Sequence, residues 1–238
     1  MCIRDRPRAM LQVTDLHVAY GQSEALHGIT LHGHANETVA IMGRNGMGKT
    51  TLFKALMGIL PVRSGRIEVA GQDVSHDESF RRVAKGIAYV PQGRMIFPTL
   101  TVEENIQTGL ENAREKVVPD EIYALFPVLW DMRGRRGGNL SGGQQQQLAI
   151  ARALVTDPKV LLLDEPTEGI QPSIIKDIAR ALNEIRKLRG ITIVVSEQVL
   201  SFAMDVADRL LVIEGGRLVH ETRRSETNEQ LIKSYLSV

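Results

Sequence analysis

A glycine-rich run that ends in lysine and threonine has the residue types and the spacing to bind a chain of phosphates. It fits the pattern Gly-x-x-x-x-Gly-Lys-Ser/Thr and follows the apolar segment 38–42. Glycines let backbone N–H groups turn toward phosphates, Lys49 can reach the outer phosphates, and the Thr50 hydroxyl can bind Mg²⁺. We therefore expect a strand, a phosphate-binding loop and a helix. The expected binding residues are Gly43, Arg44, Asn45, Gly46, Met47, Gly48, Lys49, Thr50 and Thr51.

Two carboxylates follow a continuous apolar run later in the chain. Residues 160–163 are all valine or leucine, as in a parallel strand buried on both faces, and Asp164 and Glu165 come directly after them. We expect Asp164 to hold Mg²⁺ and Glu165 to polarise the water that attacks a phosphoryl group. A solvated carboxylate pair is the alternative interpretation, and the phosphate-binding loop upstream argues against it.

The run Leu140-Ser141-Gly142-Gly143-Gln144 lies between these two motifs, where kinases and small GTPases have no such run. In this respect the chain resembles the ABC ATPase family. The resemblance implies that the run, from Ser141 to Gln144, faces the γ-phosphate of a nucleotide bound by an opposite protomer. Its two glycines permit close approach, and residues 144–154 are a plausible helix. We interpret the four glutamines at 144–147 as helix surface.

The resemblance covers residues 10–221 and extends to two further positions. It implies that Tyr20 stacks on adenine and that Gln92 contacts Mg²⁺ and the attacking water. Gln92 would also connect the site to a membrane partner through residues 93–99, which in the family line a groove for a permease helix. By residue type alone, Tyr20 could be a core or surface tyrosine, Gln92 a loop amide without a role, and Phe97 a core residue.

Two positions depart from the common family pattern. Gln198 follows the apolar segment 191–195, where most members place a switch histidine. Its amide can donate a hydrogen bond to the γ-phosphate, so we place it in the catalytic set with Glu165 and Gln92, but it cannot titrate. Gln171 stands where an aspartate is usual, so we expect different contacts between protomers through that loop.

Both departures resemble one branch of the family, the second ATPase of importers for branched-chain amino acids, amides and urea. Residues 89–105 are similar to that branch as well. Gln92, where many amino-acid members have glutamate, and the loop Glu168-Gly169-Ile170-Gln171-Pro172 favour the urea type.

The elements that must position these residues alternate between strands and helices. This alternation predicts an α/β fold of the phosphate-loop NTPase class, and the resemblance specifies the ABC ATPase type. We expect a mostly parallel sheet flanked by helices. Short strands in residues 11–31 and a hairpin at 65–71 predict an antiparallel β layer beside the nucleotide.

Proline and glycine mark the ends of several expected helices. The phosphate-loop helix is expected at residues 50–57, and a longer helix between Pro172 and Gly190. Helical stretches at 102–111 and 120–129 lie where the family inserts a helical subdomain, which we place at about residues 94–140.

Length and charge set the remaining bounds. The 238 residues carry 29 basic and 28 acidic side chains, so the charge balance favours neither nucleic acid nor an acidic membrane surface as a partner. The lone Cys2 excludes an internal disulfide, and no apolar stretch approaches the roughly 18 residues that span a bilayer. We expect one domain at 10–238. Residues 1–9 match neither a signal peptide nor the family, so we expect a non-native or disordered extension, with Met10 as the real start.

The resemblance implies an ATP-hydrolysing subunit that powers an importer, with ATP and Mg²⁺ bound. The implied partners are two integral-membrane permease subunits, a second homologous or identical ATPase subunit and, through the permease, a periplasmic solute-binding protein. The implied location is the cytoplasmic face of the bacterial inner membrane, as a peripheral subunit. Urea is the first expected substrate, with branched-chain amino acids or amides as the alternative and an exporter ATPase as a further one. Soluble relatives in translation or DNA repair fit less well, because the chain has one ATPase unit and a short interval between Lys49 and Ser141.

Overall fold

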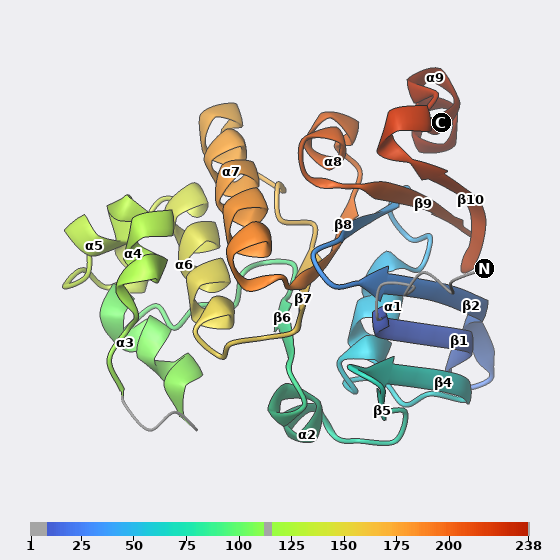
Figure 1. Cartoon of the computed structure of the whole chain (residues 1–238), viewed down its shortest axis with the longest axis horizontal. Helices are drawn as coiled ribbons and strands as arrows, with labels where there is room; N and C mark the ends of the chain where they lie inside the picture. The colour runs from blue at the N-terminus through green and yellow to red at the C-terminus, as the bar shows by residue number, and fades with distance from the viewer. Residues whose placement is uncertain (1–8, 112–115, 238) are drawn as a thin grey trace, which may run out of the picture.

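The computed structural model describes residues 9–111 and 116–237, which form two sheets and a set of helices (Figure 1). One group of helices lies on one side of the larger sheet, and the smaller sheet lies on the other side (Figure 1). Residues 1–8, which make up most of the expected extension, lie outside the described residues, whereas Ala9 already begins the first strand.

The larger sheet positions the motifs. Its described strands are β3 (Thr38–Met42), β6 (Ile87–Val90), β7 (Val160–Asp164), β8 (Thr192–Glu197), β9 (Arg209–Glu214) and β10 (Arg217–Arg223). They follow the order β10-β9-β3-β8-β7-β6; β10 pairs antiparallel with β9, and all other neighbours are parallel. Every residue of β3 and β7 is buried, because helices cover both faces of the sheet. The mostly parallel sheet expected from the sequence is therefore confirmed.

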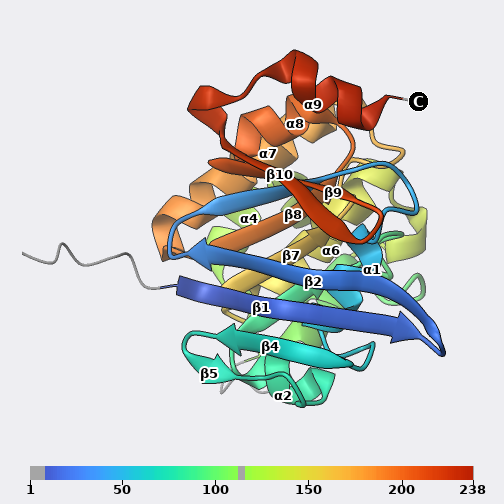
Figure 2. The same cartoon turned by 90° about the vertical axis from the view of Figure 1, so that its right-hand side faces the viewer.

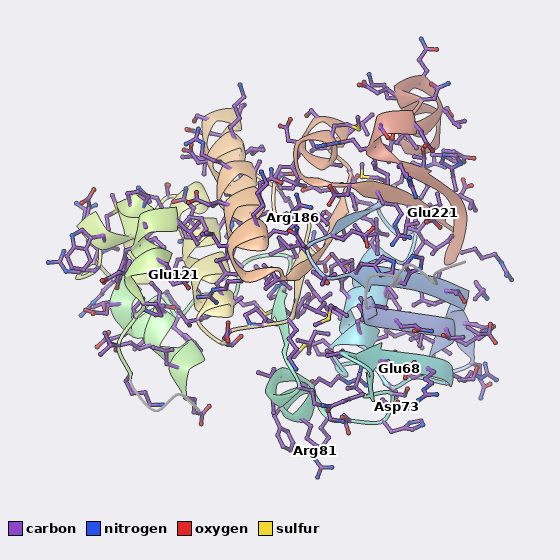
Figure 3. The ribbon with its side chains drawn as sticks, viewed as in Figure 1. Glu68, Asp73, Arg81, Glu121, Arg186 and Glu221 are labelled. Atoms are coloured by element: carbon purple, nitrogen blue, oxygen red, sulfur yellow. The ribbon has the colours of Figure 1, made fainter. Side chains whose placement is uncertain are left out.

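The smaller sheet is antiparallel and lies across the first helix from the larger sheet (Figure 2). Its described strands, in the order β2-β1-β4-β5, are β1 (Ala9–Tyr20), β2 (Ser23–His34), β4 (Ser64–Val69) and β5 (Gln72–Asp73). Glu68 and Asp73 pair across the short hairpin (Figure 3), and Arg66 forms ion pairs with both. This sheet is the expected antiparallel layer.

The expectation of short strands in residues 11–31 is wrong, because β1 and β2 have 12 residues each. Their pairing shifts register at several points, including one between Val13 and Leu16 where Asp15 has a φ of 48°. Each bulge interrupts the alternation of buried and exposed side chains, so one long strand has the sequence pattern of several short ones.

Helices cover both faces of the larger sheet. On one face, α1 (Lys49–Leu56) lies between the two sheets, and its Leu52 and Phe53 are fully buried with residues of β1 and β3. On the other face lie α7 (Pro172–Arg189) and α8 (Leu200–Val206), and α7 ends at Gly190 as expected. Within 9–111 and 116–237, no helix is both long enough and apolar enough to cross a bilayer.

The group of helices opposite the smaller sheet consists of α3 (Val102–Gln107), α4 (Asp120–Leu125), α5 (Pro127–Asp131) and α6 (Gly142–Leu154). The other short helices are α2 (Ser79–Ala84) and α9 (Glu229–Leu236). The single helix expected at 120–129 is wrong. Phe126 leaves the helical conformation, with φ −132° and ψ 73°, because a proline follows it and opens α5. The helix expected at 102–111 ends earlier, since Thr108–Leu110 form a 3₁₀ turn. The boundaries of the helical subdomain, 94–140, stay a prediction.

Candidate functional site

The loop between β3 and α1 forms one wall of a cavity of about 330 Å³. Both ends of the loop are held, because β3 lies inside the sheet and α1 is packed between two sheets. Gly48 caps α1 with a φ of 107°, a conformation that L side chains rarely adopt, so the pattern needs glycine here. The lining residues are Asn45, Gly46, Gly48, Lys49, Thr50, Thr51, Gln92 and Glu165.

Lys49 holds the loop from within. Its side chain is almost fully buried, and its ammonium donates hydrogen bonds to the carbonyl oxygens of Gly43 (2.7 Å) and Arg44 (2.9 Å). A carboxylate oxygen of Glu165 lies 3.0 Å from the same nitrogen. A buried ammonium needs such partners in place of water. The negative oxygens of phosphates bound in the loop would be equally good hydrogen-bond acceptors for the Lys49 ammonium.

Asp164 is held by three hydroxyl groups. The Ser196 hydroxyl donates to its Oδ1 at 2.6 Å, the Thr50 hydroxyl lies 3.3 Å from the same oxygen, and the Tyr89 hydroxyl donates to Oδ2 at 3.2 Å. Burial raises the pKa of Tyr89, and the charge of Asp164 adds to the rise, so Tyr89 stays a donor. Carboxylate, hydroxyl and amide oxygens are ligands that Mg²⁺ accepts, so Asp164, Thr50 and the nearby Gln92 fit this ion.

Glu165 has a strained backbone and two side-chain contacts. Its φ is 47°, in the left-handed region that glutamate seldom adopts, and its side chain is buried. Oε1 meets both the Lys49 ammonium and the side-chain amide of Gln198, which donates at 3.2 Å. The same amide nitrogen donates to Asn45 Oδ1 at 2.7 Å, so Gln198 connects the phosphate loop to Glu165.

Sequence reasoning missed several polar residues around these carboxylates. Ser196 binds Asp164 through its hydroxyl, and the backbone N–H of Glu165 points to Ser196 O and Oγ, each at 3.1 Å. Glu197 is buried beside Thr167, and Tyr89 comes from β6. These residues share one cause: β8 lies between β3 and β7, so the end of β8 must contact both motifs. The polar end of the apolar run in β8 was the available signal.

Tyr20 and Gln92 lie at the rim of the site. Tyr20 is half exposed, and its hydroxyl is 3.3 Å from Thr51 Oγ1, which places the ring beside the start of α1. Gln92 lines the cavity, and its amide donates to Glu168 Oε2 at 3.1 Å. Gln92 therefore lies between the phosphate loop and the segment after Glu165.

The expected contacts from Ser141 to Gln144 lie elsewhere in the chain. They line a second cavity, of about 700 Å³, together with Gly169 and Gln171, and the two cavities share no lining residue. Ser141 caps α6, because its hydroxyl accepts from the Gln144 N–H while the Gln144 side chain accepts from the Ser141 N–H. A Cβ at Gly143 would lie 2.8 Å from Ile174 Cγ2, so this glycine lets α6 approach α7. One chain thus does not bring these residues to its own phosphate loop.

Two residues of the segment 93–99, Met95 and Phe97, line a third, mainly apolar hollow of about 820 Å³. Ile59, Met95 and Phe97 line it with exposed side chains, so Phe97 is not the core residue that its type allowed. Arg152 of α6 fixes the segment by donating to the carbonyl oxygen of Met95 at 2.8 Å and by lying over the Phe97 ring. Arg94 reaches the carbonyl oxygen of Glu168, which joins this segment to the nucleotide side.

Known proteins resemble this chain in sequence and in fold. The family model described as ABC transporter matches residues 26–168. The high-affinity branched-chain amino acid transport ATP-binding protein BraG of Pseudomonas aeruginosa is 39% identical, over 95% of this chain and 99% of its own length. The lipopolysaccharide export system ATP-binding protein LptB of Haemophilus influenzae is 32% identical, over 94% and 95%. The structure of an ABC transporter ATP-binding cassette in its ADP conformation superposes with a TM-score of 0.76 at 28% identity, covering 96% of this chain and 94% of that one.

Proposed function

This chain belongs to the ABC transporter family as one of its ATP-hydrolysing subunits, and from that premise we propose that it powers an importer of urea. The main observation that supports ATP hydrolysis at this site is that the side chains of Lys49, Glu165 and Gln198 meet beside the phosphate loop. A role in the transport of a small solute is supported by the likeness to BraG, a high-affinity branched-chain amino acid transport ATP-binding protein.

The urea assignment rests on particular residues. Gln92 and the loop after Glu165, which reads Glu168-Gly169-Ile170-Gln171-Pro172, are the positions at which the chain resembles the urea type more than the amino-acid members. Gln92 and Glu168 are hydrogen-bonded to each other, so these two differences form one local feature. Branched-chain amino acids are the second candidate, favoured by the likeness to BraG.

In the hydrolytic step we assign the following roles to the residues around the phosphate loop. Lys49 and the N–H groups of residues 43–51 bind the β and γ phosphates, and Lys49 balances charge on the transferred group. Glu165 orients the attacking water and accepts its proton. The two hydrogens of the Gln198 amide go to Glu165 and, when nucleotide is bound, to the γ-phosphate in place of Asn45. Thr50, Gln92 and Asp164 hold Mg²⁺, which would neutralise phosphate charge.

The complete site needs a second protomer. Ser141, Gly142, Gly143 and Gln144 line a different cavity from the phosphate loop, which supports their action on a nucleotide held by a partner subunit. The capped start of α6 then presents backbone N–H groups to that γ-phosphate. Tyr20 stacks on the adenine of its own nucleotide, beside Thr51.

The hollow lined by Met95 and Phe97 receives a helix of the permease. The exposed side chains of Met95 and Phe97 offer apolar contact. Arg94 connects this hollow to Glu168, which lies in the turn after Glu165. Two permease subunits and a periplasmic solute-binding protein complete the assembly, with this chain as a peripheral subunit on the cytoplasmic face of the inner membrane.

Uptake into liposomes tests the proposal. The full chain is purified with its membrane partners, reconstituted with a candidate solute-binding protein, and assayed for ATP-dependent uptake of labelled urea and labelled leucine. We expect urea uptake that Glu165→Gln abolishes. Uptake of leucine without uptake of urea would show that the transported substrate is a branched-chain amino acid. Uptake of neither would contradict import and favour export.

A further inference from the structure

Glu197, the last residue of β8, joins two segments of the hydrolytic site through one carboxylate. Oε1 accepts from the Thr167 N–H at 3.1 Å and from the Thr167 hydroxyl at 2.7 Å. Oε2 accepts from the N–H groups of Gln198 at 3.0 Å and Val199 at 3.1 Å. The side chain is 2% exposed, so these four donors replace water.

The backbone of Glu197 reaches a third segment. The N–H of Gly43, the first residue of the phosphate loop, lies 3.4 Å from the Glu197 carbonyl oxygen. One residue therefore contacts the phosphate loop, the turn after Glu165 and the segment that carries Gln198. This follows from the position of β8 between β3 and β7.

All four partners of the carboxylate are donors, which fits the ionised form. An ionised carboxylate only accepts hydrogen bonds and offers about four lone-pair positions, so the arrangement is complete. A proton on Oε2 would face only the N–H groups of Gln198 and Val199, which cannot accept it, and a proton on Oε1 could be accepted only if the Thr167 hydroxyl stopped donating to that oxygen. Burial raises the pKa of Glu197, and hydrogen bonds from Thr167, Val199 and Gln198 oppose that rise.

We propose that Glu197 is a positioning residue for ATP hydrolysis, which fixes Gln198 relative to Glu165. The carboxylate holds the backbone of Gln198, and the Gln198 amide then meets Glu165 Oε1 and Asn45 Oδ1. The other oxygen holds Thr167, two residues after Glu165 in the same turn. Glu197 thus limits the relative motion of the base and of the residue that aligns it. The proposal rests on the roles proposed above for Glu165 and Gln198, and not on the transported substrate.

Replacing Glu197 by glutamine keeps the shape and removes half of the acceptors. The NH₂ group of a glutamine cannot accept, so either the Thr167 pair or the Gln198 and Val199 pair loses its partner. In the full chain purified with its membrane partners, we expect Glu197→Gln to lower kcat by about 10- to 100-fold with little change in the KM for ATP, the size of effect expected from misplacing a reacting group by about 1 Å.

A matched control separates this role from a purely structural one. Glu37 is also a largely buried glutamate held by an arginine and a backbone N–H, but it precedes β3 at the end away from the phosphate loop. Thermal unfolding is measured for both variants. We expect Glu37→Gln to lower the Tm without lowering kcat. Thr167→Val, which removes only the hydroxyl donor, should give a smaller fall in kcat in the same direction as Glu197→Gln.

A double-mutant cycle gives the decisive result. If Glu197 acts by fixing Gln198 relative to Glu165, adding Glu197→Gln to Gln198→Ala lowers kcat by a much smaller factor than Glu197→Gln lowers it in the wild type; only the part carried by Thr167 remains. The proposal would be overturned if the effects of the two substitutions on kcat simply multiplied. It would also be overturned if Glu197→Gln kept the wild-type kcat, or if Glu37→Gln lowered kcat as much as Glu197→Gln. Wild-type kcat in both Glu165→Gln and Gln198→Ala would instead contradict the roles on which the proposal rests.

Discussion

The ammonium of Lys49 lies 3.0 Å from a carboxylate oxygen of Glu165, and both side chains are buried. The first belongs to the helix after β3 and the second to the turn after β7, so two motifs far apart in the sequence meet in one ion pair. The pair keeps Glu165 close to the phosphate loop, and phosphate oxygens would compete with Glu165 for Lys49. When ATP is bound, its phosphate oxygens would take Lys49 away from Glu165. The Glu165 carboxylate would then be available to accept a proton from the attacking water.

Removing the Thr50 hydroxyl should weaken the response to Mg²⁺. Thr50 lies 3.3 Å from Asp164 Oδ1, and in Thr50→Val one of the three proposed ligands is lost. We expect the Mg²⁺ concentration for half-maximal ATP turnover to rise by about 10- to 100-fold. Titration of Mg²⁺ at saturating ATP measures this, with Thr51→Val as the control at the neighbouring position. Equal midpoints for Thr50→Val and wild type would remove Thr50 from the metal set.

The two glycines that begin α6 should differ in their tolerance of alanine. A Cβ at Gly143 would meet Ile174 Cγ2 at 2.8 Å, whereas one at Gly142 would meet only the guanidinium end of Arg94, at 3.2 Å. We expect Gly143→Ala to destabilise the fold by about 1 to 3 kcal/mol through overpacking. Gly142→Ala should be tolerated, because the end of an arginine can move aside. Chemical denaturation of both variants checks the prediction, and equal stabilities would contradict the packing argument.

The His17 and Glu24 pair should stabilise the β1–β2 hairpin within a window of pH. His17 Nδ1 lies 2.6 Å from Glu24 Oε1. The hydrogen bond with Glu24 raises the pKa of His17 above 6.5, and the same contact lowers the pKa of Glu24 below 4.5. The contribution of His17 is therefore complete below pH 6.5 and is lost as the pH rises through its raised pKa; that of Glu24 is present above pH 4.5 and is lost on acidification.

The difference in Tm between wild type and His17→Gln reports this window. It should be largest between pH 4.5 and 6.5 and should shrink at alkaline pH. Glu24→Gln should weaken the same pH dependence, and the contact of His17 Nε2 with Asp15 should keep a smaller part of it. A difference that grows with rising pH would contradict the assignment.

Local motifs made the phosphate loop and the two carboxylates predictable. Residues 43–50 carry their geometry in their own pattern, because a glycine such as Gly48 is required by the backbone turn itself. The apolar run before Asp164 likewise predicted a buried strand, and β7 is buried along its whole length. The α/β class and the antiparallel layer followed from such local patterns.

Contacts that depend on strand order were not predictable in the same way. Ser196 and Glu197 face the site only because β8 lies between β3 and β7, and nothing in residues 191–198 reveals which strands flank them. Gly143 was expected to serve a close approach to phosphate, while its packing against Ile174 depends on how α6 and α7 meet. The break at Phe126 was readable from the proline that follows, and the sequence interpretation overlooked it.

The central claim is that Glu165, held by Lys49 and Gln198, is the base for ATP hydrolysis. The most direct test is steady-state ATP turnover of Glu165→Gln in the full chain with its membrane partners, with nucleotide binding measured on the same sample. We predict that ATP binding stays intact while turnover falls by orders of magnitude, because an amide cannot accept the proton of the attacking water. Undiminished turnover with intact binding would contradict the claim.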